Sequence, residues 1–217
     1  DVTHRVALKN PRLNDFMTEF FIAWPLFVAI DHGYRPWHFE HHRHLGSAHD
    51  PELDSYRGHD PYRDPVSWKR VALFFVTDLF GCGLPGLFKF LKAVFPKSKP
   101  QRILYPLLLW SAFFVICWQL DALWVFGLWA WGVVGGFWAV FRVRTWTEHV
   151  GLEWSGKETS HRFTPGPLAR FLFFPHNTFC HYEHHKWPQV PYYNLPAVRA
   201  LDQSRPVLHV SQLFPVS

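Results

Sequence analysis

Two long uncharged segments, separated by one acidic residue, constrain the fold of this chain most strongly. Residues 103–120 carry no charged side chain over 18 positions, and residues 122–141 carry none over 20 positions. About 20 apolar residues are needed to span a bilayer as a helix. Because only Asp121 separates the segments, they are predicted to form a transmembrane helical hairpin. The alternative is a pair of buried core helices, but soluble helices of this length rarely lack charge altogether.

The basic residues around this hairpin predict its orientation. Lys97, Lys99 and Arg102 precede the first segment, and Arg142 and Arg144 follow the second. The connection between the segments contains no Lys or Arg. Since short cytoplasmic loops are enriched in basic residues, both outer ends of the hairpin are expected in the cytoplasm.

Two further apolar stretches are expected to lie at the membrane interface or to re-enter it, not to cross it. Residues 16–30 are short and contain Glu19 and Pro25, and residues 71–95 are interrupted by charged residues, Gly and Pro. The predicted fold is therefore an all-α integral membrane protein of one domain, residues 1–217. It combines a transmembrane hairpin with interfacial helices and a histidine-rich cytoplasmic cap.

Composition narrows the class of partner. The chain has 12 Trp and 22 Phe among 217 residues, and Trp is enriched where proteins meet the membrane–water interface. The formal net charge of +5 is compatible with nucleic acid binding. However, the basic residues flank apolar segments and form no separate basic domain. Anionic lipid headgroups or an acidic protein partner are therefore expected, and no nucleic acid.

Two histidine pentads indicate a metal site. Residues 38–42 and 181–185 both read H-x-x-H-H. Positions i, i+3 and i+4 fall on one face of a helix, so each pentad can aim three imidazoles at one point. Two converging pentads would offer six nitrogen ligands, enough to share between two ions, and imidazole suits Fe, Zn or Cu. Histidines outside the pattern, such as His49, are expected to be surface or hydrogen-bonded residues.

The elements around these pentads carry a resemblance to a known family. Arg35 to His42 contains the first pentad, and an Asp50-Pro51-Glu52-Leu53-Asp54 element follows it. Arg142 to His149 reads as R-x-x-x-E-H at its end, Asn177 leads into the second pentad, and Pro188 to Pro196 reads P-x-V-P-Y-Y-x-L-P. In all of these the sequence resembles the membrane fatty acid desaturase family, whose histidine boxes run H-x-x-x-H, H-x-x-H-H and H-x-x-H-H.

The resemblance also concerns the first residues of the chain. Asp1 to His4 is similar to the last four residues of the first box, often H-[DE]-x-x-H in the family. Its first histidine would then stand one position before Asp1. We therefore expect an N-terminally truncated chain, since family members carry a transmembrane hairpin ahead of this box.

The resemblance implies a set of metal ligands and supporting carboxylates. Asn177 would act directly or through water. Glu40, Glu148 and Glu183 could accept the second ring N–H of a ligand histidine; a solvated neighbour is the favoured interpretation of Glu40 and Glu183, and both interpretations stay open for Glu148. The implied ligands are His4, His38, His41, His42, His149, Asn177, His181, His184 and His185.

The implied activity is that of a non-haem di-iron desaturase acting at the cytoplasmic membrane face. O2 chemistry on unactivated carbon is usually delegated to iron or copper. The two iron ions would use O2 to introduce a cis double bond into a fatty acyl chain. The acyl group would be linked to CoA, carrier protein or lipid, and a separate donor such as ferredoxin or cytochrome b5 would supply electrons.

Three alternatives remain open from the sequence. A hydroxylase or ketolase of a lipid or carotenoid would use similar histidine boxes. A membrane zinc hydrolase is less well supported, because H-E-x-x-H is absent and H-x-x-E-H would require a histidine at the position of Thr145. A non-catalytic metal-binding membrane protein is the third.

Overall fold

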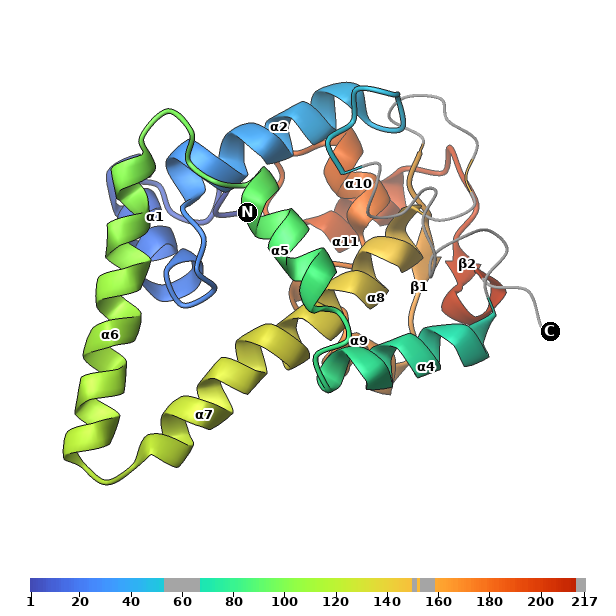
Figure 1. Ribbon diagram of the computed structural model, residues 1–217. Helices are drawn as coiled ribbons and strands as arrows, with labels where there is room; N and C mark the ends of the chain where they lie inside the picture. Colours follow the sequence, from blue (N-terminus) through green and yellow to red (C-terminus); the bar gives the residue numbers. More distant parts are fainter. Residues whose placement is uncertain (53–66, 150–151, 153–158, 214–217) are drawn as a thin grey trace. The chain divides into compact units, whose positions relative to one another are not determined.

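A computed structural model of the protein describes residues 1–52, 67–149, 152 and 159–213, and its regular structure is almost entirely helical (Figure 1). Two short strands, β1 (Phe163–Thr164) and β2 (Leu208–His209), pair in parallel. The predicted all-α class is thus confirmed.

The chain divides into two compact units. Unit 1 comprises Asp1, Glu40–Val76 and Ala139–Ser217, and unit 2 comprises Val2–Phe39 and Thr77–Trp138. The helices α2 (Arg35–His44) and α4 (Trp68–Leu79) each run through a boundary between these ranges.

Two helices are long and apolar enough to cross a membrane, which confirms the two predicted spans. The first covers Pro100–Gln119 and the second Leu123–His149. The second was expected to end near residue 141 but continues to His149, since no Gly or Pro lies between Gly136 and His149 to interrupt it. Their consecutive parts are η3 (Pro100–Ile103) and α6 (Leu104–Gln119), then α7 (Leu123–Trp131), η4 (Gly132–Phe137) and α8 (Trp138–His149).

A tight turn connects α6 to α7 (Figure 1), and hydrogen bonds at the end of α6 close this turn. The Asp121 amide donates to the Trp118 carbonyl at 3.1 Å, and the Ala122 amide donates to the Cys117 carbonyl at 2.7 Å. These two bonds form a Schellman motif, which needs a left-handed residue just after the helix. Asp121 takes that conformation with φ 52°, which Asp tolerates better than most residues. The acidic residue seen between the apolar segments therefore ends the first helix.

Unit 2 also contains residues 16–30, a segment that was expected not to cross the membrane. Glu19 is buried there, and its carboxylate accepts hydrogen bonds from the amides of Ile30 and Asp31, both at 3.0 Å, and from the Trp24 indole at 3.1 Å. Among the described residues, no candidate spanning helix covers residues 16–30. The regular elements in and beside residues 16–30 are α1 (Pro11–Thr18), η1 (Glu19–Ala23) and η2 (Ile30–Tyr34).

The stretch at residues 71–95 was expected not to cross the membrane, and this stays a prediction. It forms α4 and α5 (Leu84–Ala93), which are bent by 81° at their break, as in a broken span or a re-entrant loop. Gly81 lies in the break with φ +90°, a conformation that glycine adopts without steric cost.

Unit 1 has two small hydrophobic cores. Val71, Val143 and Trp146 form one of them. The other gathers side chains from the C-terminal third of the chain: Phe163, Phe174, Phe179, Cys180, Leu195 and Val210. The elements that surround these cores are α9 (Pro167–Leu172), η6 (Pro175–Asn177), α10 (His181–Lys186), α11 (Leu195–Leu201) and η7 (Val210–Gln212).

Candidate metal centre

The second pentad lies on the short helix α10, which a buried carboxylate anchors. Glu183 is fully buried and accepts hydrogen bonds from the Nε atoms of Arg162 at 2.6 Å and Arg199 at 2.9 Å. Arg199 Nη2 also donates to Glu183 Oε2 at 2.7 Å. The favoured interpretation of Glu183 as a solvated neighbour is therefore wrong, because two arginines pair with it inside unit 1.

The same arginines bind main-chain carbonyls. Arg162 Nη2 donates to the carbonyls of Arg199 and Asp202 at 2.7 and 2.6 Å. Arg199 donates to the carbonyls of Phe163 and Phe179 at 2.8 and 2.9 Å. A buried ion pair is tolerated when its remaining donors find partners in this way. The network fixes the orientation of α10 and of its histidines.

Four buried histidines of unit 1 bring their ring nitrogens together. They come from α2, α8 and α10, and their candidate ligand atoms lie within 4.8 Å of one another. His181 Nε2 lies 3.0 Å from His149 Nε2 and 2.8 Å from His185 Nε2. Nitrogens bound about 2.1 Å from a common ion lie roughly 3 to 3.5 Å apart. We call this set, His41, His149, His181 and His185, the four-histidine group.

The ring nitrogens of this group have too few protons to hydrogen-bond with one another, which favours a bound cation. A neutral imidazole has one donor and one acceptor nitrogen. His149 Nδ1 donates to the Thr159 carbonyl at 2.8 Å, so its Nε2 is an acceptor. One proton on His181 Nε2 cannot form a full hydrogen bond with both His149 and His185. A metal ion would satisfy all three lone pairs at once.

Two oxygens outside the group orient its rings. Asp50 Oδ1 lies 2.8 Å from His41 Nδ1, so the ionised carboxylate accepts that N–H and leaves Nε2 for a metal. The Thr159 carbonyl does the same for His149. Asp50 belongs to the sequence element Asp50-Pro51-Glu52-Leu53-Asp54, whose last two residues lie outside the described ones, and its spacing indicates no role for Asp50. Thr159 acts through its main chain, so its side chain gives no signal.

The pKa values of the rings are shifted in opposite directions. Burial lowers the pKa of His181 and His185 well below the ordinary value, and neighbouring histidines lower both pKa values further. The neutral form of imidazole is the one that binds metal. Burial also lowers the pKa of His41, but Glu52 and Asp50 raise that pKa by more, so its net shift is upward.

The other two predicted carboxylates lie in different surroundings. Glu148 is buried; its Oε1 accepts from Arg144 Nε at 2.8 Å, and its Oε2 lies 3.6 Å from His181 Nε2. It thus approaches the nitrogen that faces the other rings, not the second ring N–H. The Glu40 side chain is 45% exposed and contacts Arg43 and His44, as a solvated neighbour would.

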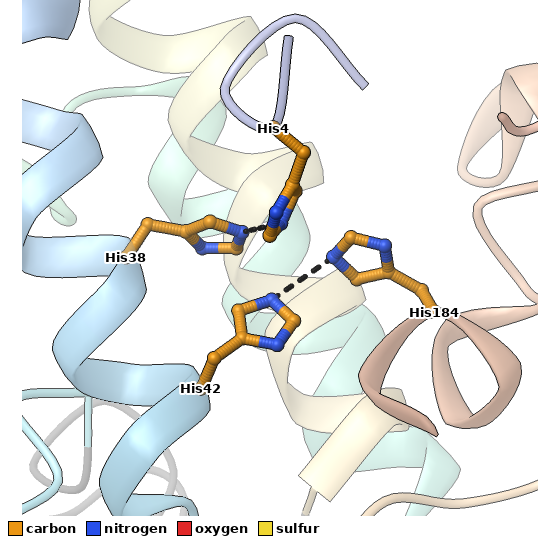
Figure 2. Close-up of side chains that lie close together, drawn as sticks. All are labelled: His4, His38, His42 and His184. Carbon is orange, nitrogen blue, oxygen red and sulfur yellow. Dashed lines mark hydrogen bonds between the residues drawn. The ribbon is translucent and has the colours of Figure 1, made fainter. Parts of the chain in front are cut away.

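The remaining predicted histidines form two pairs, each marked by a dashed line in Figure 2. Within unit 1, His42 Nε2 lies 3.1 Å from His184 Nε2. Within unit 2, His4 Nε2 lies 3.0 Å from His38 Nε2. All four rings are half-buried.

Each pentad was expected to aim its three rings at one point, but the rings of the second pentad point to different places. His181 and His185 belong to the four-histidine group, whereas His184 faces His42. Successive residues are turned by about 100° around a helix, so positions i+3 and i+4 can serve different centres.

Asn177 lies outside these histidine contacts. Its Oδ1 accepts from Arg170 Nη2 at 2.7 Å, and its Nδ2 donates to the Tyr192 carbonyl at 3.2 Å. Its assignment as a metal ligand stays a prediction.

The comparisons with known proteins bear on the resemblance noted in the sequence. The model of the fatty acid desaturase family matches residues 1–213. No curated protein and no solved structure matches the chain. With the two candidate spans, the family match indicates a membrane oxidoreductase of the desaturase type. The chain belongs to the fatty acid desaturase family.

Proposed function

We propose that this protein is an O2-dependent di-iron membrane desaturase that introduces a cis double bond into a fatty acyl chain. The observation that carries the proposal is the four-histidine group, whose candidate ligand atoms lie within 4.8 Å of one another. When bound, iron would supply the O2-derived oxidant that takes hydrogen from an unactivated methylene. Imidazole also suits zinc, but zinc has no redox chemistry.

The chain's own residues would hold two ions. The four-histidine group would take one iron. The resemblance implies a second iron and counts the histidines of the two pairs, His42 with His184 and His4 with His38, among the ligands. Asp50 and Thr159 would leave Nε2 of their partner rings free of a proton and available to the first ion. Such supporting contacts usually affect metal affinity strongly.

Unit 2 offers an apolar surface suited to an acyl chain. A hollow of about 390 Å³ lies between residues 20–25 and the spans, with an almost wholly apolar lining. Aromatic and aliphatic side chains of this kind typically line lipid-binding cavities. Its lining includes Phe20, Phe21, Trp110, Phe113, Ile116 and Trp129.

The reaction needs an external electron source. Desaturation removes two hydrogens from adjacent carbons and reduces one O2 to two waters, which also consumes two electrons and two protons. A separate carrier such as ferredoxin or cytochrome b5 would deliver the electrons, and basic residues beside the spans could dock an acidic carrier. By the positive-inside argument, this exchange would occur at the cytoplasmic face.

Product analysis tests the proposal. The complete natural polypeptide would be expressed in a lipid-producing host, and its fatty acids measured by gas chromatography–mass spectrometry. A new acyl product about 2 mass units below its precursor supports desaturation, whereas a gain of about 16 indicates the oxygen insertion of a hydroxylase. Metal analysis of the purified protein should find iron, not zinc.

A matched pair of variants tests the site. His184→Ala removes a ring that faces His42 and should abolish the product. His49→Ala removes an exposed ring outside the histidine contacts described above and should leave the product unchanged. If His184→Ala still desaturated acyl chains, the ligand assignment would be wrong.

A further inference from the structure

A polar hollow in unit 1 has no part in the site proposed above. It has a volume of about 640 Å³, and its polar lining comes from Arg170, His176, Asn177 and Tyr192. None of the described residues that line it is acidic. The Asp1 carboxylate accepts a hydrogen bond from the Tyr192 amide at 2.9 Å but does not line the hollow. A hollow with a cation and no carboxylate in its lining favours an anionic ligand.

Arg170 is the cation of this hollow, and two contacts hold its side chain. Its Nη2 donates to Asn177 Oδ1 at 2.7 Å, and its Cζ lies 5.0 Å from the centroid of the Phe179 ring. Within the described ranges, no carboxylate pairs with Arg170, and its other N–H groups have no acceptor. The planar fork of an arginine matches a phosphate group through two parallel hydrogen bonds. The guanidinium is therefore held in place with donors left for a phosphate.

The segment that carries Asn177 has an unusual backbone. His176 and Asn177 are consecutive residues in the left-handed region, with φ 54° and 56°. This conformation is unfavourable for a residue with a side chain and is found more often at ligand sites. Asn177 also bridges two other lining residues, since it accepts from Arg170 and donates to the Tyr192 carbonyl at 3.2 Å. The segment thus ties together the polar lining of the hollow.

Apolar side chains beside the hollow are exposed. On α9, Leu168 is 72% exposed and Phe171 is 78% exposed, so water would surround two large apolar side chains in a soluble protein. Phe173 follows α9 and contacts Phe75 of α4, with a distance of 5.3 Å between the ring centroids. α4 belongs to the bent helix pair that is apolar enough for a broken span or a re-entrant loop. Because α9 adjoins this apolar element, lipid is the occupant that suits its exposed face.

The polar hollow and the apolar face meet on α9. Arg170 lines the hollow, and Phe171 both lines it and is exposed. A cation beside exposed apolar side chains matches the boundary between lipid headgroups and acyl chains, where a basic side chain reaches the phosphates. We propose that this hollow binds the phosphate group of a glycerophospholipid, with Arg170 as its ligand and Phe171 in contact with the acyl chains. The inference goes beyond the proposed function and does not depend on it.

The test compares Arg170→Gln with Arg12→Gln. Both remove one positive charge from an exposed arginine, but Arg12 lies on α1 and does not line the hollow. The complete polypeptide would be purified in a neutral detergent, freed of lipid and titrated with dioleoylphosphatidylglycerol. Native mass spectrometry resolves the protein with no, one or several bound lipids and so measures the dissociation constant of each step. Circular dichroism measures the helical content of each variant.

We expect the wild type to bind one phospholipid more tightly than any further one. Arg170→Gln should weaken this first binding step by about 10-fold, as expected for loss of a hydrogen bond to a charged group. Arg12→Gln should leave it unchanged. Phe171→Ser should also weaken the first step, because the acyl chains lose an apolar contact. Leu201→Ser changes a similarly exposed residue outside the hollow and should not weaken it.

An unchanged first binding step in a folded Arg170→Gln protein would overturn the proposal. If that variant loses helical content, Phe171→Ser decides in its place, since an exposed side chain can be replaced without disturbing a core. An unchanged first step in Phe171→Ser would then overturn the proposal equally. Displacement of the lipid by an equal concentration of inorganic phosphate would overturn it as well, because the hollow would then hold a soluble anion. The desaturase proposal is tested separately by its product and its iron, so it stands whichever result is obtained.

Discussion

The two units of the molecule are stabilised in different ways. Unit 1 buries charged side chains in directed contacts, as at Glu183 with Arg162 and Arg199. Unit 2 also buries Glu19 and Arg35 in directed contacts, but its two spans meet through ring contacts, such as Phe126 with Trp110 at a centroid distance of 5.8 Å. Only 11% and 17% of the apolar windows of the two spans are buried within the protein. The remaining apolar surface suits lipid.

This difference teaches where each unit is vulnerable. A buried polar network requires every partner, because an unpaired group in a low dielectric is expensive. A lipid-facing aromatic surface tolerates exchange of one apolar side chain for another of similar size. Unit 1 should therefore lose stability when single charged residues are replaced, and unit 2 should lose it also where two backbones approach closely.

The largest effect is expected at Glu183. Glu183→Ala would leave Arg162 and Arg199 buried without their carboxylate. Breaking a buried pair by removing one partner typically costs about 3–5 kcal/mol. Chemical denaturation in detergent should show this loss of unfolding free energy. Iron binding should be reduced as well.

The control is a carboxylate in an exposed pair. Glu40→Ala removes the partner of Arg43, whose side chain is 65% exposed, and should leave the unfolding midpoint almost unchanged because exposed pairs contribute little. Equal losses of stability in Glu183→Ala and Glu40→Ala would contradict the view that unit 1 depends on its buried network.

The second prediction concerns a close backbone approach within unit 2. A Cβ added at Gly33 would overlap the Val94 carbonyl oxygen, whereas one added at Gly127 meets no atom within 4 Å. Gly33→Ala should therefore destabilise the protein by about 1–3 kcal/mol, as overpacking does. Gly127→Ala should have little effect. Thermal unfolding of both variants in the same detergent checks this, and a tolerated Gly33→Ala would show that the contact can relax.

The third prediction concerns the support of the metal site. Asp50→Ala removes the acceptor of His41 Nδ1 and should weaken iron binding by about 10–100-fold. His49→Ala, at the neighbouring exposed position, should bind iron like the wild type. Chelator competition measures both affinities. Wild-type affinity in Asp50→Ala would mean that other contacts hold the His41 ring.

These comparisons also show what could be predicted from the sequence. The spans followed from uncharged length, and the histidine contacts followed from the two pentads, because both are local patterns. His149 was indicated by the R-x-x-x-E-H element alone. The arginines that hold Glu183 could not be predicted, since they lie 16 and 21 residues from it and meet it only through tertiary folding. The division of each pentad between different contacts was also missed, because spacing places rings on a face without choosing their partners.

The smallest effect is expected where an ion pair of unit 1 lies near the surface. Asp202 accepts hydrogen bonds from the Ser204 amide at 3.0 Å and from Lys186 Nζ at 3.1 Å. Hydrogen bonds from Ser204, and then from Lys186, lower the pKa of Asp202 from 3.8 to about 2. Because the pKa is lower in the folded state, the resulting stabilisation is fully present above pH 3.8 and is lost as the pH falls through about 2.

Asp202→Asn should therefore lower the thermal midpoint slightly at neutral pH, and this difference should vanish toward pH 2. Added salt should also reduce it, since water and ions screen a pair near the surface. Unfolding scans of the wild type and the variant over this pH range measure the effect. A loss at neutral pH as large as that of Glu183→Ala would mean that burial does not decide which ion pairs stabilise unit 1, and the contrast between the units would then need another cause.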